Sequence, residues 1–352
     1  MANGISTLDD VAKIAGVCKS TASRILAVKR GDRLPFSAKT QEKVRNAADK
    51  LGYRPSKLAR GLTGTKTGIV GLVIPSVMDS FFPNVTTVIE SLLAERGYNV
   101  ILTNTNADSA IERAKIEDLM SWRVDGFIVA PSQEAGDAGL YWDLWSSKVP
   151  FVLIDRFFAD TPFCSVITDD YAGGVMAVEH LLAIGRKRIA RAGGSLAVST
   201  NRLRHAGYSD ALIRNGIMPD ERYSIEVPPT GEGGHIAFAR LAELDPHPDA
   251  VFCFSDPVAA GIMEACEESG VSIPGDLAVV GYADLHYSSL LRVGLTTVRQ
   301  PRQQLGQRAA EALIAQMEGG SGAVESVKLP VELVIRESTV SQPAKRRPMA
   351  KW

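Results

Sequence analysis

Apolar and polar positions alternate at helical spacing from the seventh residue onward. The apolar positions of this first repeat are Leu8, Val11, Ala12 and Ala15. Their spacing predicts an amphipathic helix. Thr7, with Asp10 three residues later, forms a capping box that begins the helix. Gly16 permits the tight turn that ends it.

A second short helix is expected directly after this turn. Its inward positions are Thr21, Ala22, Ile25 and Leu26. Side chains able to bond phosphates or base edges occupy its other face, at Lys19, Ser20, Ser23 and Arg24. Two short helices joined by a glycine turn, the second polar outward, are typical of a helix-turn-helix whose second helix enters the major groove. The alternative is a small helical hairpin with no nucleic-acid role.

A third helix is predicted over residues 37–51, with Ser37 as N-cap and Gly52 as stop. Its apolar stripe is Val44, Ala47, Ala48 and Leu51. The residue before Pro55 disfavours helix, so the unit ends there. Residues 56–64 then form an amphipathic stretch too short to be a stable helix alone, which is the property of a segment that orders on binding.

Charge separates the start of the chain from the remainder. Residues 1–66 carry 14 Lys/Arg and 5 Asp/Glu, a formal charge of +9, although the whole chain has 39 basic and 40 acidic residues. The remainder therefore carries −10. A basic segment supplies the phosphate neutralisation that drives DNA affinity. This asymmetry favours double-stranded DNA as a partner over a purely structural helical unit.

From residue 67 the pattern changes to apolar runs of strand length that alternate with helical segments. The expected strands lie within residues 68–75, 98–104, 125–131, 149–155, 188–194, 250–256 and 277–284, and helices are expected over 85–95, 111–122, 174–184 and 258–269. Alternation of this kind predicts parallel sheets with right-handed crossovers. The number of units exceeds one sheet, so two doubly wound α/β subdomains are expected, with a ligand cleft beyond the strands' carboxyl ends.

Composition excludes several classes of protein. No apolar stretch is long enough to cross a bilayer, and the polar start MANGISTLDDVAK lacks the apolar region of a secretory signal. A cytoplasmic protein with no membrane partner is expected. The five histidines show no metal-ligand spacing, and no phosphate-binding or nucleophile-elbow motif is present. We therefore expect a protein that is not an enzyme and needs no metal or cofactor.

The four cysteines show neither a CxxC motif nor paired metal-ligand spacing. Cys164, Cys253 and Cys266 are expected to be buried, reduced thiols. Cys18 stands at the start of the second helix, where it either packs or acts as a redox-sensing thiol.

Eight segments, in order, make the chain resemble the LacI/GalR family of transcriptional repressors, from Thr7 to Pro343. They are the opening TLDDVAKIAGVCKSTASRIL with the linker GYRPSKLARGLTG, then GLVIPSVMDSFFP, HLLAIGRKRIARAGG with RHAGYSDAL, VVGYADLHYS, GLTTVRQP and LPVELVIREST. The resemblance implies a homodimer on a pseudo-palindromic operator. It also implies a sugar-like effector in a body similar to periplasmic sugar-binding proteins.

The domain boundaries follow from the pattern and the resemblance together. A DNA-binding domain is expected over residues 1–55 and a hinge helix over 56–66. The effector-binding and dimerisation domain is expected over 67–343, with subdomain 1 at about 67–166 and 298–328 and subdomain 2 at about 167–297 and 329–343. The basic tail 344–352 has no heptad repeat, which favours a dimer over a coiled-coil tetramer.

The resemblance assigns the DNA contacts to particular residues. Lys19, Ser20 and Arg24 would reach base edges, and Thr21 and Ser23 would hold phosphates. Arg24 has the geometry to read guanine with two hydrogen bonds, and a phosphate clamp is the equal alternative. In the hinge, Leu62 would open a central base step from the minor groove, or pack on its dimer mate, with Ala59 beside it.

For the effector, the resemblance points to Arg204, whose guanidinium suits hydroxyls and carboxylates; a surface salt bridge is the alternative. Phe81 and Phe82 would stack on a sugar ring or pack in the core. Further cleft positions are Ser76, Ser132, Asp155 and Ser255. Asp170 is expected to cap the helix that follows it.

Two departures from the family pattern bear on the effector. The family's Gly-Tyr-Asp motif is Gly281-Tyr282-Ala283 here, with Asp284 one residue later as a possible replacement for the lost carboxylate. The common Asn-Asp pair is Ser255-Asp256. Losing a carboxylate while keeping Arg204 motivates the hypothesis of an anionic effector, such as a sugar acid or a phosphorylated sugar.

The expected mechanism is a coupling between two sites. An effector in the cleft would reorient the subdomains, change the spacing of the paired hinge segments and so alter DNA affinity, with operator DNA changing effector affinity by the same factor. The rival hypotheses are a periplasmic solute-binding receptor, which would have a signal peptide and no basic head, and an enzyme that uses the cleft.

Overall fold

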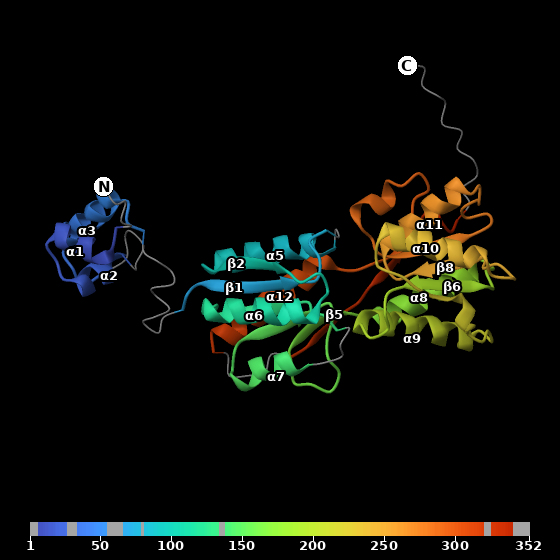
Figure 1. The fold of residues 1–352 in the computed structure, drawn as a ribbon, viewed down its shortest axis with the longest axis horizontal. Coiled ribbons are helices and arrows are strands. Elements are labelled where there is room, and N and C mark those ends of the chain that lie inside the picture. Colours follow the sequence, from blue (N-terminus) through green and yellow to red (C-terminus); the bar gives the residue numbers. More distant parts are fainter. Residues whose placement is uncertain are drawn as a thin grey trace, which may run out of the picture. The chain divides into compact units, whose positions relative to one another are not determined.

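The computed structural model describes residues 6–26, 34–54, 66–78, 81–133, 138–319 and 325–340. Its contacts divide the chain into two compact units, one ending at Thr67 and one beginning at Gly68. We call these units the head and the body (Figure 1). This division falls one residue after the predicted boundary between the hinge and the effector-binding domain, which was placed between residues 66 and 67.

The head contains helices α1 (Leu8–Ala15), α2 (Lys19–Leu26) and α3 (Ala38–Leu51). The Thr7 capping box is present in full, and Gly16 ends α1 in the left-handed conformation at φ 67°. Ser37 and Gly52 cap α3 as the pattern predicts. Of the four inward positions predicted for α2, Ala22 and Ile25 are fully buried, whereas Thr21 and Leu26 are half-buried. The buried side chains of the three helices form one small core.

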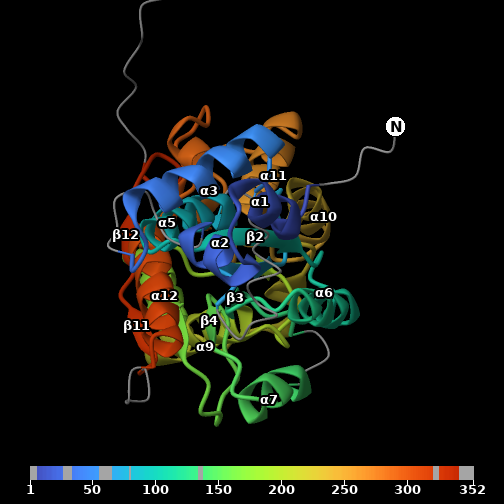
Figure 2. The same cartoon turned by 90° about the vertical axis from the view of Figure 1, so that its left-hand side faces the viewer.

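The body consists of two α/β lobes. The first lobe has a six-stranded sheet in the order β11-β5-β4-β3-β1-β2. Its strands are β1 (Ile69–Ile74), β2 (Asn99–Asn104), β3 (Gly126–Val129), β4 (Phe151–Ile154), β5 (Ser165–Thr168) and β11 (Val327–Leu329). Its helices are α5 (Phe81–Glu95), α6 (Ser109–Ser121), α7 (Gly139–Ser146) and α12 (Arg302–Met317). Figure 2 shows α5 and α12 on one side of these strands and α6 and α7 on the other.

The second lobe repeats this plan with the order β12-β10-β9-β8-β6-β7. Its strands are β6 (Ile189–Gly193), β7 (Ser224–Glu226), β8 (Ala250–Cys253), β9 (Ala278–Ala283), β10 (Thr296–Arg299) and β12 (Glu332–Val334). Its α-helices are α8 (Asp170–Ala183), α9 (Ser199–Arg214), α10 (Gly231–Ala242) and α11 (Asp256–Glu268), and 3-10 turns cover Glu221–Tyr223 and His286–Ser289.

All seven predicted strands and four predicted helices are present, and the doubly wound class is confirmed. Two details differ from the expectation of parallel sheets alone. The strand pair β10–β12 is antiparallel, and no apolar run in the sequence predicted the strands β5, β7, β10, β11 and β12, which are only three or four residues long. Such short strands gain their stability from neighbours in the sheet, so the local sequence carries little signal for them.

Among the described residues the chain passes between the lobes three times, after β5, after β10 and after β11. Strands β5 and β10 each extend two residues beyond the subdomain boundaries suggested by the sequence. These crossings bring segments far apart in the sequence to the space between the lobes. That space is where ligands bind in folds of this type.

Candidate functional sites

Helix α2 presents a polar, solvent-exposed face. Ser20, Ser23 and Arg24 are exposed, as the helical pattern predicts. Lys19 is exposed as well, and its Nζ lies 2.7 Å from an Asp9 carboxylate oxygen. Exposed ion pairs of this kind contribute little to stability, so the Lys19 ammonium can exchange Asp9 for a phosphate or base at small cost.

Hydroxyl and thiol groups cluster at the first turn of α2. The Cys18 sulfur lies 3.0 Å from Thr21 Oγ1 and 3.2 Å from Ser20 Oγ. Hydrogen bonds from Ser20 and Thr21 lower the pKa of the Cys18 thiol to about 7. Cys18 is exposed, and the other three cysteines are buried free thiols, as predicted. Thr21, assigned to phosphate by the resemblance, is therefore engaged with Cys18 in this structure. Ala59 and Leu62 lie outside the described residues.

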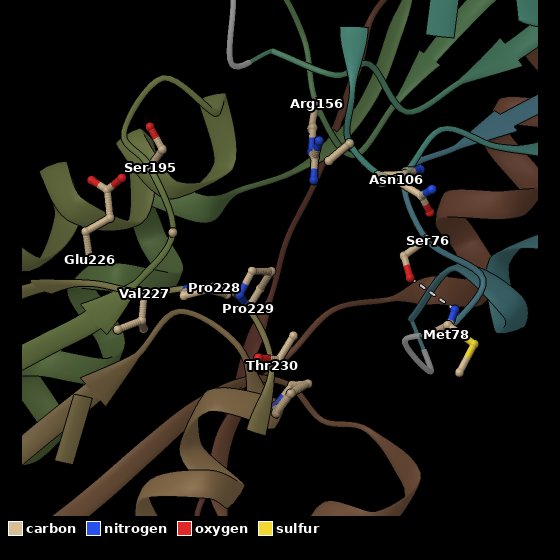
Figure 3. Close-up of a pocket in the computed structure, with 14 residues that line it drawn as sticks. Ser76, Met78, Asn106, Arg156, Ser195, Glu226, Val227, Pro228, Pro229 and Thr230 are labelled. Atoms are coloured by element: carbon tan, nitrogen blue, oxygen red, sulfur yellow. Dashed lines mark hydrogen bonds between the residues drawn. The ribbon is translucent and has the colours of Figure 1, made fainter. Parts of the chain in front are cut away.

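Two adjacent cavities lie between the lobes of the body, with volumes of about 810 and 150 Å³. Figure 3 shows the larger one, with Ser76 and Asn106 on the first-lobe side, Ser195 and Glu226 on the second-lobe side, and the Arg156 side chain extending into the space between them. Of the predicted effector residues, Ser76 lines the larger cavity. The smaller cavity is lined by Phe81, Phe82, Asp155, Arg204 and Ser255.

Arg204 is the centre of the smaller cavity. Its Nε and Nη2 each lie 2.8 Å from an Asp170 carboxylate oxygen, and its Nη1 donates to the Phe254 carbonyl at 2.5 Å. Its guanidinium also stacks on the Tyr282 ring, 3.7 Å from the centroid. Both charged groups are buried, so the sequence alternative of a surface salt bridge is wrong. Because a buried charge needs a partner, Asp170 keeps Arg204 ionised in place.

Close backbone packing makes this pair possible. Gly174 of α8 and Gly207 of α9 face each other so tightly that a Cβ at either position would collide with the backbone of the other helix. This approach brings Asp170, at the start of α8, to Arg204. The expectation that Asp170 caps α8 is wrong, because Asp169 supplies the cap by accepting from Ala172 N.

Phe81 and Phe82 pack in the core, which was one of the two roles left open by the sequence, and stacking on a sugar ring stays a prediction. They stand in the first turn of α5, are buried, and meet edge to face with centroids 5.1 Å apart. They belong to the first-lobe core and also line the smaller cavity. Ser255 lines the same cavity, and its buried hydroxyl has no hydrogen-bond partner among the described residues.

The structure does not bring Ser132 and Asp284 to either cavity lining. Ser132 Oγ lies 3.2 Å from Thr105 Oγ1 within the first lobe. The Asp284 carboxylate contacts Arg299 Nε and Arg336 Nη2, each at 2.6 Å. Positive φ values of 120° and 50° at Ala283 and Asp284 turn the chain at the end of β9. The sequence left open whether Asp284 replaces the lost carboxylate, and in this structure it does not line either cavity, so its listing among the effector residues is corrected.

Arginine pairing also fixes the charge of Asp284. Burial raises its pKa, but hydrogen bonds from Arg299 and Arg336 outweigh burial and leave the pKa below its ordinary value. Arg302 donates to the carbonyls of both Ala283 and Asp284. The Asp284 carboxylate is thus held within the second lobe, and only the backbone carbonyls of Ala283 and Asp284 contact Arg302 of the first lobe.

Residues that the sequence reasoning missed line the cavities as well. Arg156 lines both, and its Nη1 donates to the Pro131 carbonyl at 3.0 Å. Its buried Nε has no hydrogen-bond partner among the described residues. Asn201 and Gln300 line the smaller cavity. Arg156 and Gln300 each follow a strand's carboxyl end, which is the signal that could have identified them.

The described residues hold no cluster of three or more His, Cys, Asp or Glu side chains suited to a metal ion. Within the same residues, every helix is too short or too polar to span a bilayer.

Comparisons with known proteins agree with this architecture. Residues 7–56 match the model of the bacterial regulatory proteins of the lacI family, and residues 178–339 match the periplasmic binding protein-like domain. The HTH-type transcriptional repressor PurR of Vibrio atlanticus (strain LGP32) is 32% identical over 95% of this chain and 98% of its own length. The ribose operon repressor of Haemophilus influenzae (strain ATCC 51907 / DSM 11121 / KW20 / Rd) is 29% identical over 96% and 99%.

Solved structures show the same likeness. The lac repressor dimer bound to operator and the anti-inducer ONPF is 30% identical, with a TM-score of 0.83 over 96% of this chain and 100% of that one. A complex of the transcriptional regulator CelR with cellobiose has a TM-score of 0.72 at 28% identity, over 95% and 99%. The chain belongs to the lacI family of bacterial regulatory proteins. It is a DNA-binding transcriptional regulator with a ligand-binding domain, and the expectation that it is not an enzyme is confirmed by these relatives.

Proposed function

We propose that this protein is a homodimeric repressor that binds a pseudo-palindromic operator. When a sugar-like effector enters the cleft, the affinity for the operator either falls or rises. The observation that carries the proposal is the exposed polar face of α2 on a basic head, joined to a body whose cavities lie between two lobes. Paired reading helices match paired half-sites, so dimer symmetry and operator symmetry are expected to correspond.

In this proposal Lys19, Ser20 and Arg24 reach base edges, and Ser23 and Thr21 hold phosphates. Thr21 must then leave Cys18 when DNA binds, since its hydroxyl contacts the thiol in the free protein. Such an exchange costs little because both groups are near solvent. Selection of bound duplexes from a random pool by the full chain tests the assignment. Enrichment of a two-fold symmetric site is expected, and a pool that stays random would contradict it.

The hinge residues Ala59 and Leu62 complete the DNA contacts in the proposal, although both lie outside the described residues. Leu62 is expected to wedge into the minor groove at the centre of the operator. Leu62→Ala should weaken binding to the selected duplex while leaving effector affinity of the free protein unaltered. Fluorescence anisotropy with labelled duplex measures the first, and calorimetry measures the second. Equal losses in both would show that Leu62 belongs to a core.

For the effector, we propose a polyhydroxylated molecule with one acidic group, a sugar acid or a sugar phosphate. Arg204 is neutralised by Asp170, so it offers hydrogen bonds to hydroxyls and no net charge. The acidic group would lie against Arg156, because its buried Nε forms no hydrogen bond among the described residues and faces the Asp155 carboxylate only at 3.7 Å. Asp155 and Asn201 would bond further hydroxyls.

Matched pairs of neutral and acidic sugars test this assignment. Thermal unfolding of the full chain is measured with D-glucose, D-gluconate and D-glucose 6-phosphate, and with D-ribose and D-ribose 5-phosphate. A ligand at about 100 times its dissociation constant adds about 2.7 kcal/mol to the free energy of unfolding. An acidic member should raise the melting temperature and its neutral partner should not. Stabilisation by a neutral sugar alone would refute an anionic effector.

A further inference from the structure

Gln133, in the loop that follows β3, connects the two lobes through its side-chain amide. The side chain is buried, with 3% of the residue's surface exposed. Its Nε2 donates to the carbonyl of Phe157 in the first lobe at 2.6 Å. Its Oε1 accepts from the backbone N–H of Ser199, the first residue of α9 in the second lobe, at 2.8 Å. One amide thus holds two backbone groups from different lobes.

This contact supplies what α9 lacks. The first N–H groups of any helix have no partners within the helix, and a side chain of the preceding residue usually accepts one of them. The preceding residue here is Val198, which forms no side-chain cap. The side chain of Gln133, which belongs to the other lobe and lies 66 positions earlier in the chain, accepts the hydrogen bond from Ser199 N instead. Phe157 N adds a second contact by donating to Ser199 Oγ at 3.3 Å.

Residues 131 and 132, just before Gln133, are held within the first lobe by hydrogen bonds. Ser132 N donates to Glu112 Oε2 at 2.7 Å, and Tyr141 OH donates to Glu112 Oε1 at 2.6 Å. Arg156 Nη1 donates to the Pro131 carbonyl next to it. Glu112 and Tyr141 are both buried, so water does not compete for these bonds. Gln133 therefore acts from a rigid support.

We propose that Gln133 is a positioning residue that caps α9 from the opposite lobe and so fixes the approach of α9 to the cleft. Helix α9 carries Thr200, Asn201 and Arg204 to the smaller cavity, and the cap lies at the residue just before them. Separation of the lobes would uncap α9, and closure would restore the cap. The consequence for effector binding rests on the effector cleft proposed above, whereas the cap itself does not.

A glutamine suits this role because its amide both donates and accepts. Gln133→Met keeps a similar volume and removes both bonds. Gln133→Glu keeps an acceptor for Ser199 N and loses the donor to Phe157. Ser199→Ala removes the hydroxyl and keeps the N–H that Gln133 binds. These three variants separate capping of α9 from packing of the loop.

Hydrogen exchange measured by mass spectrometry on the full, ligand-free chain tests the proposal. In Gln133→Met, peptides covering residues 195–203 should exchange about five-fold faster, the factor that corresponds to losing one helix cap. The same peptides in Gln133→Glu and Ser199→Ala should exchange at the wild-type rate, as should peptides from β8 and β9 in all variants. Wild-type exchange in Gln133→Met, or equal acceleration in Gln133→Met and Gln133→Glu, would overturn the proposal.

Should Gln133→Met fail to fold, Gln133→Asn replaces it. Its amide is one methylene shorter and cannot reach both lobes, so local acceleration at residues 195–203 is again expected, and its absence again overturns the cap. The outcome is independent of the effector, because no ligand is present. A sugar panel without any binder would count against the proposed effector class and leave the exchange result standing.

Discussion

The head and the body present their sites in opposite ways. The exposed polar face of the head lies on one eight-residue helix, α2, and is the face proposed above to read DNA. The cavities of the body are lined by residues that range from Pro75 to Gln300, and the charged groups of Asp155 and Arg204 at the smaller one are buried. A local, exposed site is tuned by side-chain chemistry alone. A buried site assembled from distant segments depends on the partners that hold each charge.

The two arginines of these sites illustrate the difference. Arg24 is exposed and its positive charge is available to DNA. Arg204 is buried, and three groups fix it: Asp170, the Phe254 carbonyl and the Tyr282 ring. We therefore expect Arg24→Ala to weaken DNA binding without affecting stability, and Arg204→Ala to reduce the stability of the fold.

The largest effect is expected from Arg204→Ala. The substitution leaves the Asp170 carboxylate buried without its partner, which typically costs about 3–5 kcal/mol of stability. Urea unfolding of the full chain measures this loss. Asp170→Asn with Arg204→Ala should recover part of it, because the unpaired charge is then removed. A loss below about 1 kcal/mol would place the pair among solvent-screened ion pairs and remove the contrast with Arg24.

Arg24→Ala should leave the unfolding curve within about 0.5 kcal/mol of wild type, as is usual for exposed positions. Binding to the selected duplex should fall by about 5- to 150-fold if Arg24 reads a guanine, which corresponds to about 1–3 kcal/mol. Anisotropy titrations against matched and mismatched duplexes measure both affinity and discrimination. Arg24→Lys decides between the two hypotheses: a phosphate clamp tolerates lysine, whereas two-bond recognition of a base does not.

A smaller effect is expected from Thr7→Ala, which removes the capping box of α1. Loss of an N-cap costs about 1 kcal/mol, so amides of residues 8–16 should exchange about five-fold faster by hydrogen-exchange mass spectrometry. Ser37→Ala is the matched control, since Ser37 caps α3 in the same way. It should accelerate exchange in α3 and spare α1. Unaltered exchange in both variants would mean that packing alone sets the stability of the head.

The smallest expected effect concerns the reactivity of the Cys18 thiol toward an alkylating reagent. The pKa of Cys18 is lowered to about 7, and the thiolate is the reactive form. Alkylation by iodoacetamide should rise with pH through about 7 and level off above it. Burial raises the pKa of Cys164 to about 11 and that of Cys266 to about 12, so these thiols should stay unmodified. A midpoint near the ordinary thiol value would contradict the contacts with Ser20 and Thr21.

Within the described residues of the head, the sequence predicted the three helices and the caps of α1 and α3, because these signals are local. The capping box of α1, the Gly16 turn and the caps of α3 are formed by residues within a few positions of one another. The reading face follows from the same periodicity. In the body, the long apolar strands and the doubly wound class were predicted for the same reason, since a run such as residues 69–74 is apolar whatever its neighbours are.

What the sequence did not predict involves partners far apart in the chain. The pairing of Arg204 with Asp170 depends on two glycines that let α8 and α9 touch. Asp284 was expected in the cleft, but the turn at the end of β9 directs it to Arg299 and Arg336. Arg156 and Gln133 carried no motif, and their importance arises from the loops that surround them.

The amino-acid sequence by itself therefore determined that a basic helix-turn-helix precedes a body of alternating strands and helices, and that this chain resembles one family of regulators. Only the tertiary structure decided which polar groups line the cavities and which form hydrogen bonds or ion pairs with other side chains instead. The physical reason is that a buried charge or amide must find its partner within hydrogen-bond distance. Which partner lies there is set by tertiary contacts such as the close approach of α8 and α9 at Gly174 and Gly207, which no local pattern records.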